Sequence, residues 1–306
     1  MQNNVSTAAL RPFLTDDIPD LPVSDWRLLG KGLWGEVHDL GDGSILKLVR
    51  RAGGLGSGES KVIREGAALG LLGGLANDYV RVPRLIGSAL FRNGYIGSAM
   101  GMPPLAGWVR IERLAGEAID GHAVAMVPSR RETLGERLGA AIAALHEAAA
   151  PHLDEMARLG DPILRSLKEA VVHLGGPSDR SRLDRLETEW RGSVSAPVVL
   201  HGDINLGNIL YTERAGPIGF VDFAEAGAGA PEADLRHFEG FGPLRDAILR
   251  GYGAFLGEKP DMARYRMATA VDAAVTLAIE GSAGHPREAM RRRYWLDECL
   301  RQAGIE

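Results

Sequence analysis

Residues 201–210 read His-Gly-Asp-Ile-Asn-Leu-Gly-Asn-Ile-Leu. A short apolar stretch precedes this segment and another follows it, so we expect a tight loop between two strands. The spacing H-G-D-x-x-x-x-N places Asp203 and Asn208 on that one loop. Asp222 follows a short way along the chain, at the end of a further apolar stretch. The sequence therefore predicts that three polar side chains meet where short strands end.

These three side chains make a coherent chemical set. A carboxylate can orient and deprotonate a hydroxyl group, and an amide with a second carboxylate can hold Mg²⁺. We therefore expect Asp203 to be the catalytic residue and Asn208 and Asp222 to be the metal ligands of a phosphoryl-transfer site. A plain turn rich in Asp and Asn is the alternative, but it does not account for all the spacings together.

Toward the N-terminus, residues 30–37 read Gly-Lys-Gly-Leu-Trp-Gly-Glu-Val, which fits G-x-G-x-x-G-x-V. Gly30, Gly32 and Gly35 would let the backbone approach phosphate oxygens and offer N–H donors. In a dinucleotide site the third glycine opens a helix, whereas here a strand-like stretch and an Asp-Gly hairpin signal at 42–43 follow. The motif favours a β-turn-β flap over nucleotide phosphates, with a plain glycine-rich hairpin as the alternative.

Lys47 lies in the apolar stretch Ile-Leu-Lys-Leu-Val, where an unpaired charge costs free energy. We expect its partner to be Glu65, which lies in the middle of a helix predicted over 59–72. Glu59 competes, but it lies too near the start of that helix. Such a pair would hold the ammonium group toward the α- and β-phosphates of a nucleotide. The alternative is an edge-strand lysine that faces solvent.

The secondary structure expected from the sequence changes near residue 115. The first part is mostly strand-like with one helix, and the second is mostly helical with short strand-like pieces at 197–201, 208–212 and 217–222. Ser129, with Glu132 three positions later, predicts a capping box at the start of a helix that runs to about residue 149. We expect an α+β fold with two lobes: a small antiparallel β-sheet N-lobe at 1–115 that binds nucleotide, and a larger, mainly helical C-lobe at 116–306.

Composition excludes several classes of protein. The 306 residues are 45% hydrophobic and 25% charged, as in globular proteins that stay in solution. A net charge of −5 leaves no basic footprint for nucleic acid, and no run of 18 apolar residues predicts a membrane span. The single cysteine, Cys299, excludes a disulfide framework and fits a reducing compartment. With no apolar signal segment in residues 1–21, we expect a cytoplasmic protein and an unreactive Cys299.

The motifs in their order along the chain resemble the protein-kinase-like fold. Within that fold, the HGD form of the loop resembles the aminoglycoside phosphotransferase (choline kinase-like) family, and the resemblance covers about residues 26–300. It rests on the segments 30–37, Lys47, Glu65, 111–116, 144–147, 201–208 and 222–235.

Three features separate this pattern from protein kinases. Asn205 stands at the second position after Asp203, where a Ser/Thr protein kinase has lysine. The segment between His146 and His201 is long enough for two extra helices that such a kinase lacks. The segment between Asp222 and Asp234 is too short for an activation segment that docks a peptide.

Two departures from the family pattern leave the subfamily and the substrate open. Asn205 stands where many members have His. Ala224 replaces the glycine of the D-F-G motif of protein kinases.

The resemblance implies a kinase that transfers the γ-phosphate of ATP or GTP, with Mg²⁺, to a hydroxyl group of an antibiotic or metabolite. It implies that the nucleotide lies between the lobes, with Ile111 behind the purine and backbone groups of Glu112 and Leu114 on the base. His201 and Asp234 would brace the loop. His146 and His173 are expected to be packing or surface residues. A protein kinase and a nucleotide-binding regulator without turnover are the alternatives.

Charge is distributed unevenly along the chain. Residues 1–115 carry 13 Lys and Arg against 11 Asp and Glu, whereas residues 116–306 carry 22 against 29, a balance of −7. Four carboxylates follow soon after Asp222: Glu225, Glu232, Glu239 and Asp246. In the family the acceptor binds the second lobe, and a cleft lined by one sign of charge concentrates ligands of the opposite sign. The pattern favours a cationic, amine-bearing acceptor, with chance or solvated helix faces as the alternative.

Overall fold

The computed structural model describes residues 14–15, 17–22, 26–52, 56–91, 104–119, 126–174, 176–212, 216–282 and 286–305. The chain forms two compact units, one of residues 1–74 with 83–114 and the other of residues 75–82 with 115–306. The first lobe expected from the sequence, residues 1–115, includes 75–82. These residues belong to the second unit because strand β4 (Val80–Arg81) pairs with β10 (Ile218–Phe220).

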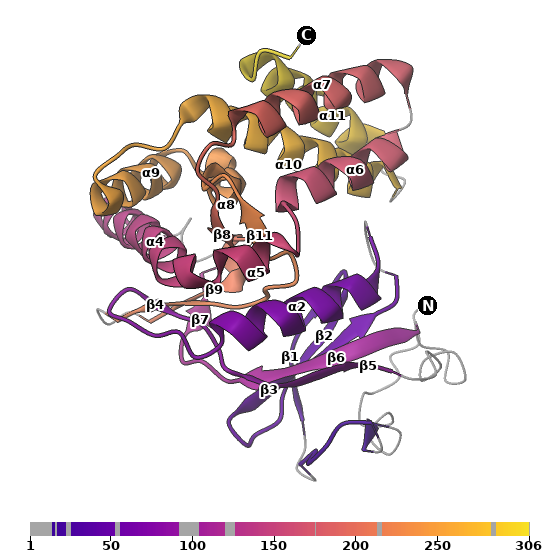
Figure 1. Ribbon diagram of the computed structural model, residues 1–306, viewed down its shortest axis with the longest axis vertical. Coiled ribbons are helices and arrows are strands. Elements are labelled where there is room, and N and C mark those ends of the chain that lie inside the picture. Colours follow the sequence, from indigo (N-terminus) through magenta and orange to yellow (C-terminus); the bar gives the residue numbers. More distant parts are fainter. Residues whose placement is uncertain are drawn as a thin grey trace. The chain divides into compact units, whose positions relative to one another are not determined.

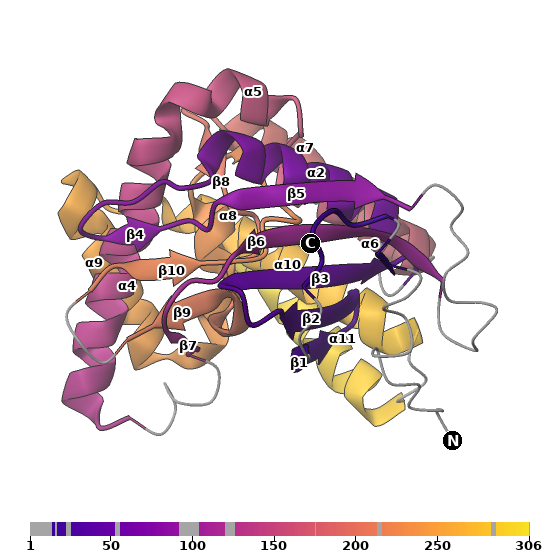
Figure 2. The same ribbon diagram turned by 90° about the horizontal axis from the view of Figure 1, so that it is seen from below.

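The first unit is a five-stranded antiparallel sheet with one long helix. The sheet order is β1-β2-β3-β6-β5 (Figure 2), and the Asp42-Gly43 turn joins β2 to β3, as the hairpin signal predicts. Helix α2 packs on β5 and β6 and runs along one face of the sheet (Figure 1). The elements are β1 (Arg27–Gly32), β2 (Gly35–Asp39), β3 (Ser44–Arg50), α2 (Gly58–Leu72), β5 (Leu85–Leu90) and β6 (Leu105–Glu112).

The alternation of side chains along β3 determines which way Lys47 points. Leu46 and Leu48 belong to a buried apolar cluster on one face of the sheet, together with Leu14 and Trp108. Because neighbouring side chains of a strand point to opposite faces, Lys47 points away from that cluster. It meets helix α2 there, on the opposite face.

The second unit is mainly helical and holds two small sheets. The strand orders are β4-β10-β9-β7 and β11-β8. Its remaining elements are β7 (Glu117–Ala118), α4 (Pro128–Ala149), η3 (Ala150–His152), α5 (Leu153–Ala157), α6 (Pro162–Leu174), α7 (Pro177–Ser193), β8 (Val198–Leu200), η4 (Leu206–Asn208), β9 (Ile209–Tyr211), β11 (Gly227–Gly229), α8 (Glu232–Leu235), η5 (Arg236–Phe241), α9 (Pro243–Leu256), α10 (Met262–Ser282) and α11 (Pro286–Gln302). Within the described ranges, none of these helices combines the length and the apolar content of a membrane span.

Helices α4 and α9 pack closely because glycines line their contact. A Cβ atom at Gly139 would lie 2.0 Å from the Ile248 carbonyl oxygen, and one at Gly251 would lie 2.1 Å from that of Glu136. Only glycine permits this separation of the helix backbones. The close approach brings His146 of α4 against Tyr252 of α9, which matters for the loop described below.

The predicted start of α4 is wrong by two positions. The helix begins at Pro128, its N-cap is Val127, and no side chain caps it. Ser129 therefore lies inside the first turn and makes no capping box. Proline at the first helical position has its φ already in the helical range and lacks the N–H that would be unsatisfied there, so it starts the helix ahead of the Ser129 signal.

Candidate active site

The loop 201–208 joins β8 to β9, as the sequence predicts. The N–H of Val221 donates to the Asn208 carbonyl at 3.0 Å, which extends the antiparallel pairing of Phe220 with Ile209 by one step. Asp222 is the next residue, so the backbone ladder carries it beside Asn208. Asp222 has φ of +68°, a left-handed conformation that is uncommon for a residue other than glycine. Backbone strain of this kind concentrates at functional sites.

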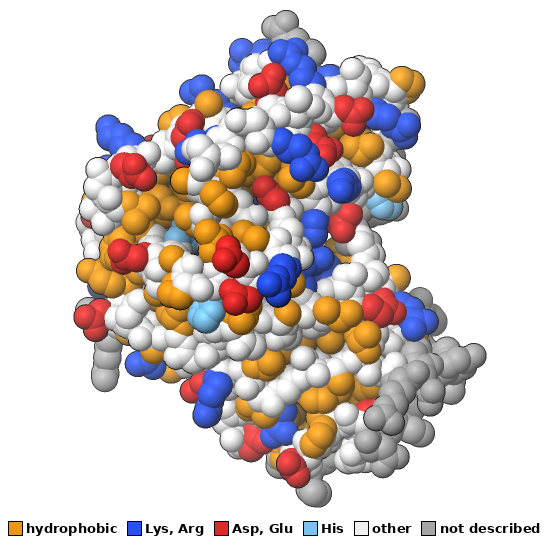
Figure 3. Space-filling model, in the orientation of Figure 1, with side chains coloured by type: hydrophobic (Ala, Val, Ile, Leu, Met, Phe, Trp, Pro, Cys, Tyr) orange, Lys and Arg blue, Asp and Glu red, His pale blue; other side chains and the backbone are white. Residues whose placement is uncertain are grey.

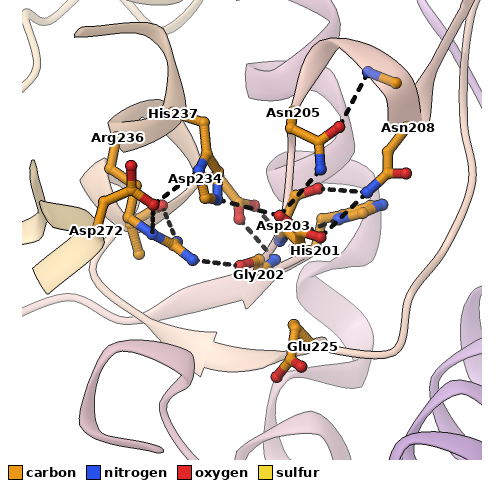
Figure 4. Close-up of polar contacts among 12 residues, drawn as sticks. His201, Gly202, Asp203, Asn205, Asn208, Glu225, Asp234, Arg236, His237 and Asp272 are labelled. Atoms are coloured by element: carbon orange, nitrogen blue, oxygen red, sulfur yellow. Dashed lines mark hydrogen bonds and ion pairs between the residues drawn. The ribbon is translucent and has the colours of Figure 1, made fainter. Parts of the chain in front are cut away.

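The Asp203 carboxylate is held by amide groups of its own loop (Figure 4). Asn208 Nδ2 donates to the Asp203 carbonyl at 2.9 Å and to Asp203 Oδ2 at 3.2 Å, while Asn205 Nδ2 donates to Oδ1 at 3.1 Å. Asn205 Oδ1 accepts from the N–H of Gly207 and so caps η4. The Asp203 side chain is still 35% exposed. It is thus both oriented and accessible to a ligand.

The amide of Asn208 has an orientation that suits a metal ligand. Its Nδ2 group is committed to Asp203, and its Oδ1 atom makes no hydrogen bond with any residue in the described ranges. Asp222 adds a carboxylate one step beyond the Asn208–Val221 pair. Mg²⁺ prefers hard oxygen ligands and takes only one or two of them from the protein, with nucleotide phosphates completing the shell. The donor set of Asn208 and Asp222 fits that requirement.

Asp234 holds the first residues of the loop through hydrogen bonds to their backbone. Its side chain is fully buried, and its two oxygens accept from the N–H groups of His201 at 2.9 Å and Gly202 at 2.7 Å. Gly202 has φ of +86°, and a Cβ there would lie 2.1 Å from the Glu225 carbonyl oxygen. Arg236 donates to the Gly202 carbonyl at 2.7 Å. At the start of the loop, side chains therefore hold both the backbone N–H groups and the Gly202 carbonyl.

His146 belongs to this bracing network, whereas from the sequence we expected a packing or surface residue. The ring is buried, with Nε2 at 3.1 Å from Asp234 Oδ2 and Nδ1 at 3.0 Å from the Tyr252 hydroxyl. Burial would raise the pKa of Asp234, but the hydrogen bond and charge of His146 and the N–H of Gly202 outweigh it and hold that pKa below its ordinary value. Asp234 is thus a stable anion under the loop.

His201 is a buried, neutral support. Its Nε2 donates to the Val221 carbonyl at 3.0 Å, and its Nδ1 accepts from the N–H of Asp203 at 3.3 Å, so one proton on the ring satisfies both contacts. Burial lowers the pKa of His201, although the charges of Asp234 and Asp203 act in the opposite direction. The ring connects the loop 201–208 to the residue before Asp222, as expected for a structural role.

The lowered pKa of His201 predicts acid-sensitive folding. Below its ordinary value near 6.5, the unfolded chain binds a proton that the folded ring resists, so the free energy of unfolding should fall as the pH drops from 7.5 to 5. His38, whose pKa burial also lowers, adds to the effect in the first unit. Urea unfolding of wild type and His201→Asn at both pH values measures the slope. The variant should lose less stability on acidification, the exposed His173→Asn variant should behave as wild type, and equal losses in all three proteins would contradict the assignment.

The first unit carries the residues that the sequence predicts to bind nucleotide, and that role stays a prediction. Lys47 Nζ lies 2.9 Å from Glu65 Oε2, and Glu65 is only 2% exposed. Glu59, the competing partner, pairs with Arg51 at 2.7 Å instead. The expected ion pair is therefore present, and it is the buried one of the two.

The glycine motif forms a β-turn-β hairpin from β1 and β2, not a strand-to-helix turn. A Cβ at Gly35 would lie 1.9 Å from the Leu48 carbonyl oxygen, so glycine is required where the hairpin lies against β3. Gly30 and Gly32 have open space around them. The motif therefore forms the predicted β-turn-β hairpin, with two unobstructed glycines in β1, and its role as a flap over nucleotide phosphates stays a prediction.

Glu112 and Leu114 lie at and just after the end of β6. The N–H of Glu112 already donates to the Arg84 carbonyl at 2.9 Å, and the Glu112 carboxylate lies 4.0 Å from the Arg84 side chain. Leu114 follows in an irregular segment, where it is half-buried between the exposed Arg113 and Ala115. The binding of a purine base by the backbone of Glu112 and Leu114 stays a prediction.

The four carboxylates that favour a cationic acceptor each have an arginine partner. Glu232 is buried and pairs with Arg264 at 2.9 Å. The other contacts are Glu225–Arg165 at 3.7 Å, Glu239–Arg245 at 3.0 Å and Asp246–Arg245 at 2.8 Å. On the face shown in Figure 3, acidic and basic side chains of the helical unit are interspersed and not gathered by sign. These four residues therefore do not form an unopposed negative surface.

A family model described as "Phosphotransferase enzyme family" matches residues 41–268. That range includes Lys47, Glu65 and the whole segment from His201 to Asp234. The chain belongs to this family. It is therefore a phosphotransferase with an alcohol group as acceptor, and the resemblance to the aminoglycoside phosphotransferase (choline kinase-like) family is confirmed. No curated protein matches the chain in sequence at a significant level.

Solved structures of the family share the fold along the whole chain. The GDP and kanamycin complex of APH(2")-IIia has a TM-score of 0.65 at 18% identity, covering 96% of this chain and 98% of that one. A thermostable mutant of the aminoglycoside phosphotransferase APH(4)-Ia, with AMP-PNP and hygromycin B, has a TM-score of 0.63 at 15% identity over 97% and 99%. A choline/ethanolamine kinase family protein from Mesorhizobium loti has a TM-score of 0.58 at 15% identity over 96% and 94%. The predicted α+β, protein-kinase-like fold is thereby confirmed.

Two residues near Asp203 were not singled out from the sequence. His237 lies with its Nε2 3.3 Å from Asp203 Oδ1, and its Nδ1 lies 3.0 Å from Asp272 Oδ1. Asp272 stands in the apolar run Ala-Thr-Ala-Val-Asp-Ala-Ala-Val at 268–275. A lone carboxylate in such a run signals a buried partner by the same reasoning that identified Lys47. No comparable sequence signal marks His237.

Proposed function

We propose that this protein transfers the γ-phosphate of ATP or GTP, as the Mg²⁺ complex, to a hydroxyl group of an antibiotic or metabolite. The observation that carries the proposal is the Asp203 carboxylate, which is accessible yet oriented by Asn205 and Asn208 on a loop braced by Asp234. This geometry suits a group that accepts a hydrogen bond from an acceptor hydroxyl and takes its proton as the phosphate is transferred.

The other predicted residues take roles that suit this reaction. Lys47, held by Glu65, would bind nucleotide phosphates, and the flap with Gly30, Gly32 and Gly35 would offer backbone N–H groups to them. The backbone at Leu114, with Glu112 before it, would meet the base. Mg²⁺, held by Asn208 and Asp222, would neutralise charge on the phosphates.

The direct test is a phosphate-transfer screen with purified protein. Each of ATP and GTP is offered with Mg²⁺ and a panel of aminoglycosides, choline-like amines, sugars and nucleosides. Phosphate should appear on a hydroxyl of at least one acceptor, and Asp203→Asn protein serves as the blank. Nucleotide binding without transfer to any acceptor would instead favour a regulator without turnover.

The metal assignment predicts a specific loss in nucleotide binding. Asn208→Ala and Asp222→Ala should each reduce the gain in nucleotide affinity that Mg²⁺ produces, because each removes one of the few protein oxygens available to the ion. Calorimetric titration of nucleotide with and without Mg²⁺ measures this gain. Asp184→Ala, at an exposed position on α7, is the control and should keep the full gain. If the two site variants also keep it, the ligands lie elsewhere.

An amine-bearing acceptor remains part of the proposal, supported by the −7 balance of residues 116–306 and not by the four arginine-paired carboxylates. The aminoglycosides named for the neighbouring structures are compatible with it. Screening acts over about 8–10 Å at physiological ionic strength, so kcat/KM for a cationic acceptor should fall as salt is added. Rates that do not respond to salt, or an anionic acceptor, would contradict this part.

The cytoplasmic location expected from the single cysteine stays a prediction.

A further inference from the structure

His237 lies between two carboxylates that come from distant parts of the second unit (Figure 4). Its Nδ1 is 3.0 Å from Oδ1 of Asp272 on α10, and its Nε2 is 3.3 Å from Oδ1 of Asp203 on the catalytic loop. The imidazole itself comes from η5. Nε2 is buried and has no aligned hydrogen bond among the described residues, so the Asp203 carboxylate is the acceptor within its reach.

The contacts of Asp203 divide its two oxygens into different roles. An ionised carboxylate offers about two acceptor positions on each oxygen. Oδ1 faces two donors, Asn205 Nδ2 at 3.1 Å and His237 Nε2 at 3.3 Å. Oδ2 accepts from Asn208 Nδ2 alone, at 3.2 Å, among the residues that the structure describes. The acceptor position that stays available on this carboxylate is therefore on Oδ2.

Asp272 holds the imidazole in the orientation that produces this division. Burial would raise the pKa of Asp272, but the charge and hydrogen bond of His237 and the charge of Arg236 outweigh it and keep that pKa below its ordinary value. Asp272 is thus an anion that accepts from Nδ1–H. A ring that also donates from Nε2 to Asp203 carries a proton on each nitrogen, and its positive charge lies between the two carboxylates. Arg236, the residue before His237, donates to the Gly202 carbonyl at 2.7 Å. Two consecutive residues of η5 therefore secure the backbone and the catalytic side chain of one loop.

We propose that His237, oriented by Asp272, is a positioning residue that engages Oδ1 of Asp203 and so reserves Oδ2 for the hydroxyl of the acceptor. The inference rests on the proposed function, in which Asp203 meets that hydroxyl. Without the imidazole, the carboxylate can rotate and present either oxygen at a less favourable distance. A misplacement of about 1 Å in a reacting group can cost about 10²-fold in rate, so the effect should appear in kcat and not in substrate affinity.

Three substitutions separate the two contacts of the ring. Glutamine places an amide nitrogen near the position of Nε2, so His237→Gln keeps a donor for Asp203. Asparagine places it near Nδ1, so His237→Asn keeps a donor for Asp272 and loses the one for Asp203. His237→Phe keeps a ring and loses both donors. His173→Phe, at an exposed position on α6, is the matched control.

Steady-state kinetics with the acceptor found in the screen give the first test. His237→Asn and His237→Phe should lower kcat by about 10–10²-fold with little change in either KM, because orientation is lost and binding is kept. His237→Gln should recover most of the rate, and His173→Phe should match wild type. A wild-type kcat in His237→Phe, or a His237→Gln variant as slow as His237→Phe, would overturn the inference.

A second readout does not depend on turnover. Long-range ¹H–¹⁵N spectra of histidine rings in the whole protein report the hydrogen bonding of each ring nitrogen, and the His237 signals are identified by their loss in His237→Gln. Asp203→Asn should shift the Nε2 signal and Asp272→Asn the Nδ1 signal, while Asp184→Asn should shift neither. Unchanged His237 signals in Asp203→Asn would overturn the inference. If wild type transfers no phosphate in the screen, the proposed function fails, and these spectra still decide whether His237 engages Asp203.

Discussion

Asp203→Asn is expected to abolish phosphate transfer while nucleotide binding persists. Loss of a positioned general base typically lowers the rate by about 10²–10⁴-fold. Asp203 is not among the proposed metal ligands, so the Mg²⁺–nucleotide complex should still bind. Single-turnover transfer to the best acceptor, with nucleotide affinity measured alongside, separates the two effects.

The structure adds a cost in stability to this variant. All three side chains around the Asp203 carboxylate, those of Asn205, Asn208 and His237, present nitrogen atoms to it. An amide at this position must turn its own N–H₂ group toward one of those donors, which leaves a partly buried polar group unsatisfied at about 1–3 kcal/mol. Thermal unfolding of Asp203→Asn beside Asp184→Asn, an exposed aspartate on α7, shows whether the loss of rate exceeds the loss of folded protein. A folded Asp203→Asn variant with the wild-type rate would remove Asp203 from the mechanism.

The parts of the site that lie close together in the sequence were the parts that could be predicted. The loop from His201 to Asn208 is a continuous segment, and Asp222 follows it by one hairpin. Local spacing and the pairing of adjacent strands therefore determine where Asp203, Asn208 and Asp222 lie. The Lys47–Glu65 contact could be predicted because a strand and the helix after it pack face to face, and a charge in an apolar strand requires a partner.

The parts that could not be predicted depend on packing between distant elements. Asp272 reaches His237 only because α10 packs against η5, and nothing in the intervening sequence encodes that contact. Charge counts have a related limit. The net balance of residues 116–306 does not reveal that Glu225 and Glu232 pair with arginines of α6 and α10, two helices far from them in the sequence.

His146 is another residue whose role depends on packing between elements that are distant in the sequence. From the sequence we expected a packing or surface residue, and the structure buries the ring. Glycines at the contact of α4 and α9 bring its ring to Tyr252, and its other nitrogen reaches Asp234. The distance between the two helix backbones therefore determines whether this histidine only packs or also holds the loop. That distance cannot be read from a pattern of residues.

Lys47→Met is expected to destabilise the first unit and to impair nucleotide use, more than Glu65→Gln does. Glu65 is 2% exposed, whereas Lys47 is 13% exposed. Removing the lysine leaves the more deeply buried charge without its ion-pair partner, and breaking a buried pair in this way costs about 3–5 kcal/mol. The KM for nucleotide should rise or kcat should fall steeply in the same variant, because the group proposed to bind the phosphates is gone.

A double-mutant cycle separates the pair from its surroundings. The variants are Lys47→Met, Glu65→Gln and the two combined, with urea unfolding and nucleotide kinetics measured for each. Directly contacting residues show coupling of about 0.5–3 kcal/mol, so the double variant should lose less than the sum of the single losses. Arg51→Met with Glu59→Gln is the matched control in the same unit, since that ion pair is 54% and 30% exposed and should be worth less than about 1 kcal/mol. Additive losses at Lys47 and Glu65 would show that the two residues act independently, and would leave the lysine without the partner that orients it toward the phosphates.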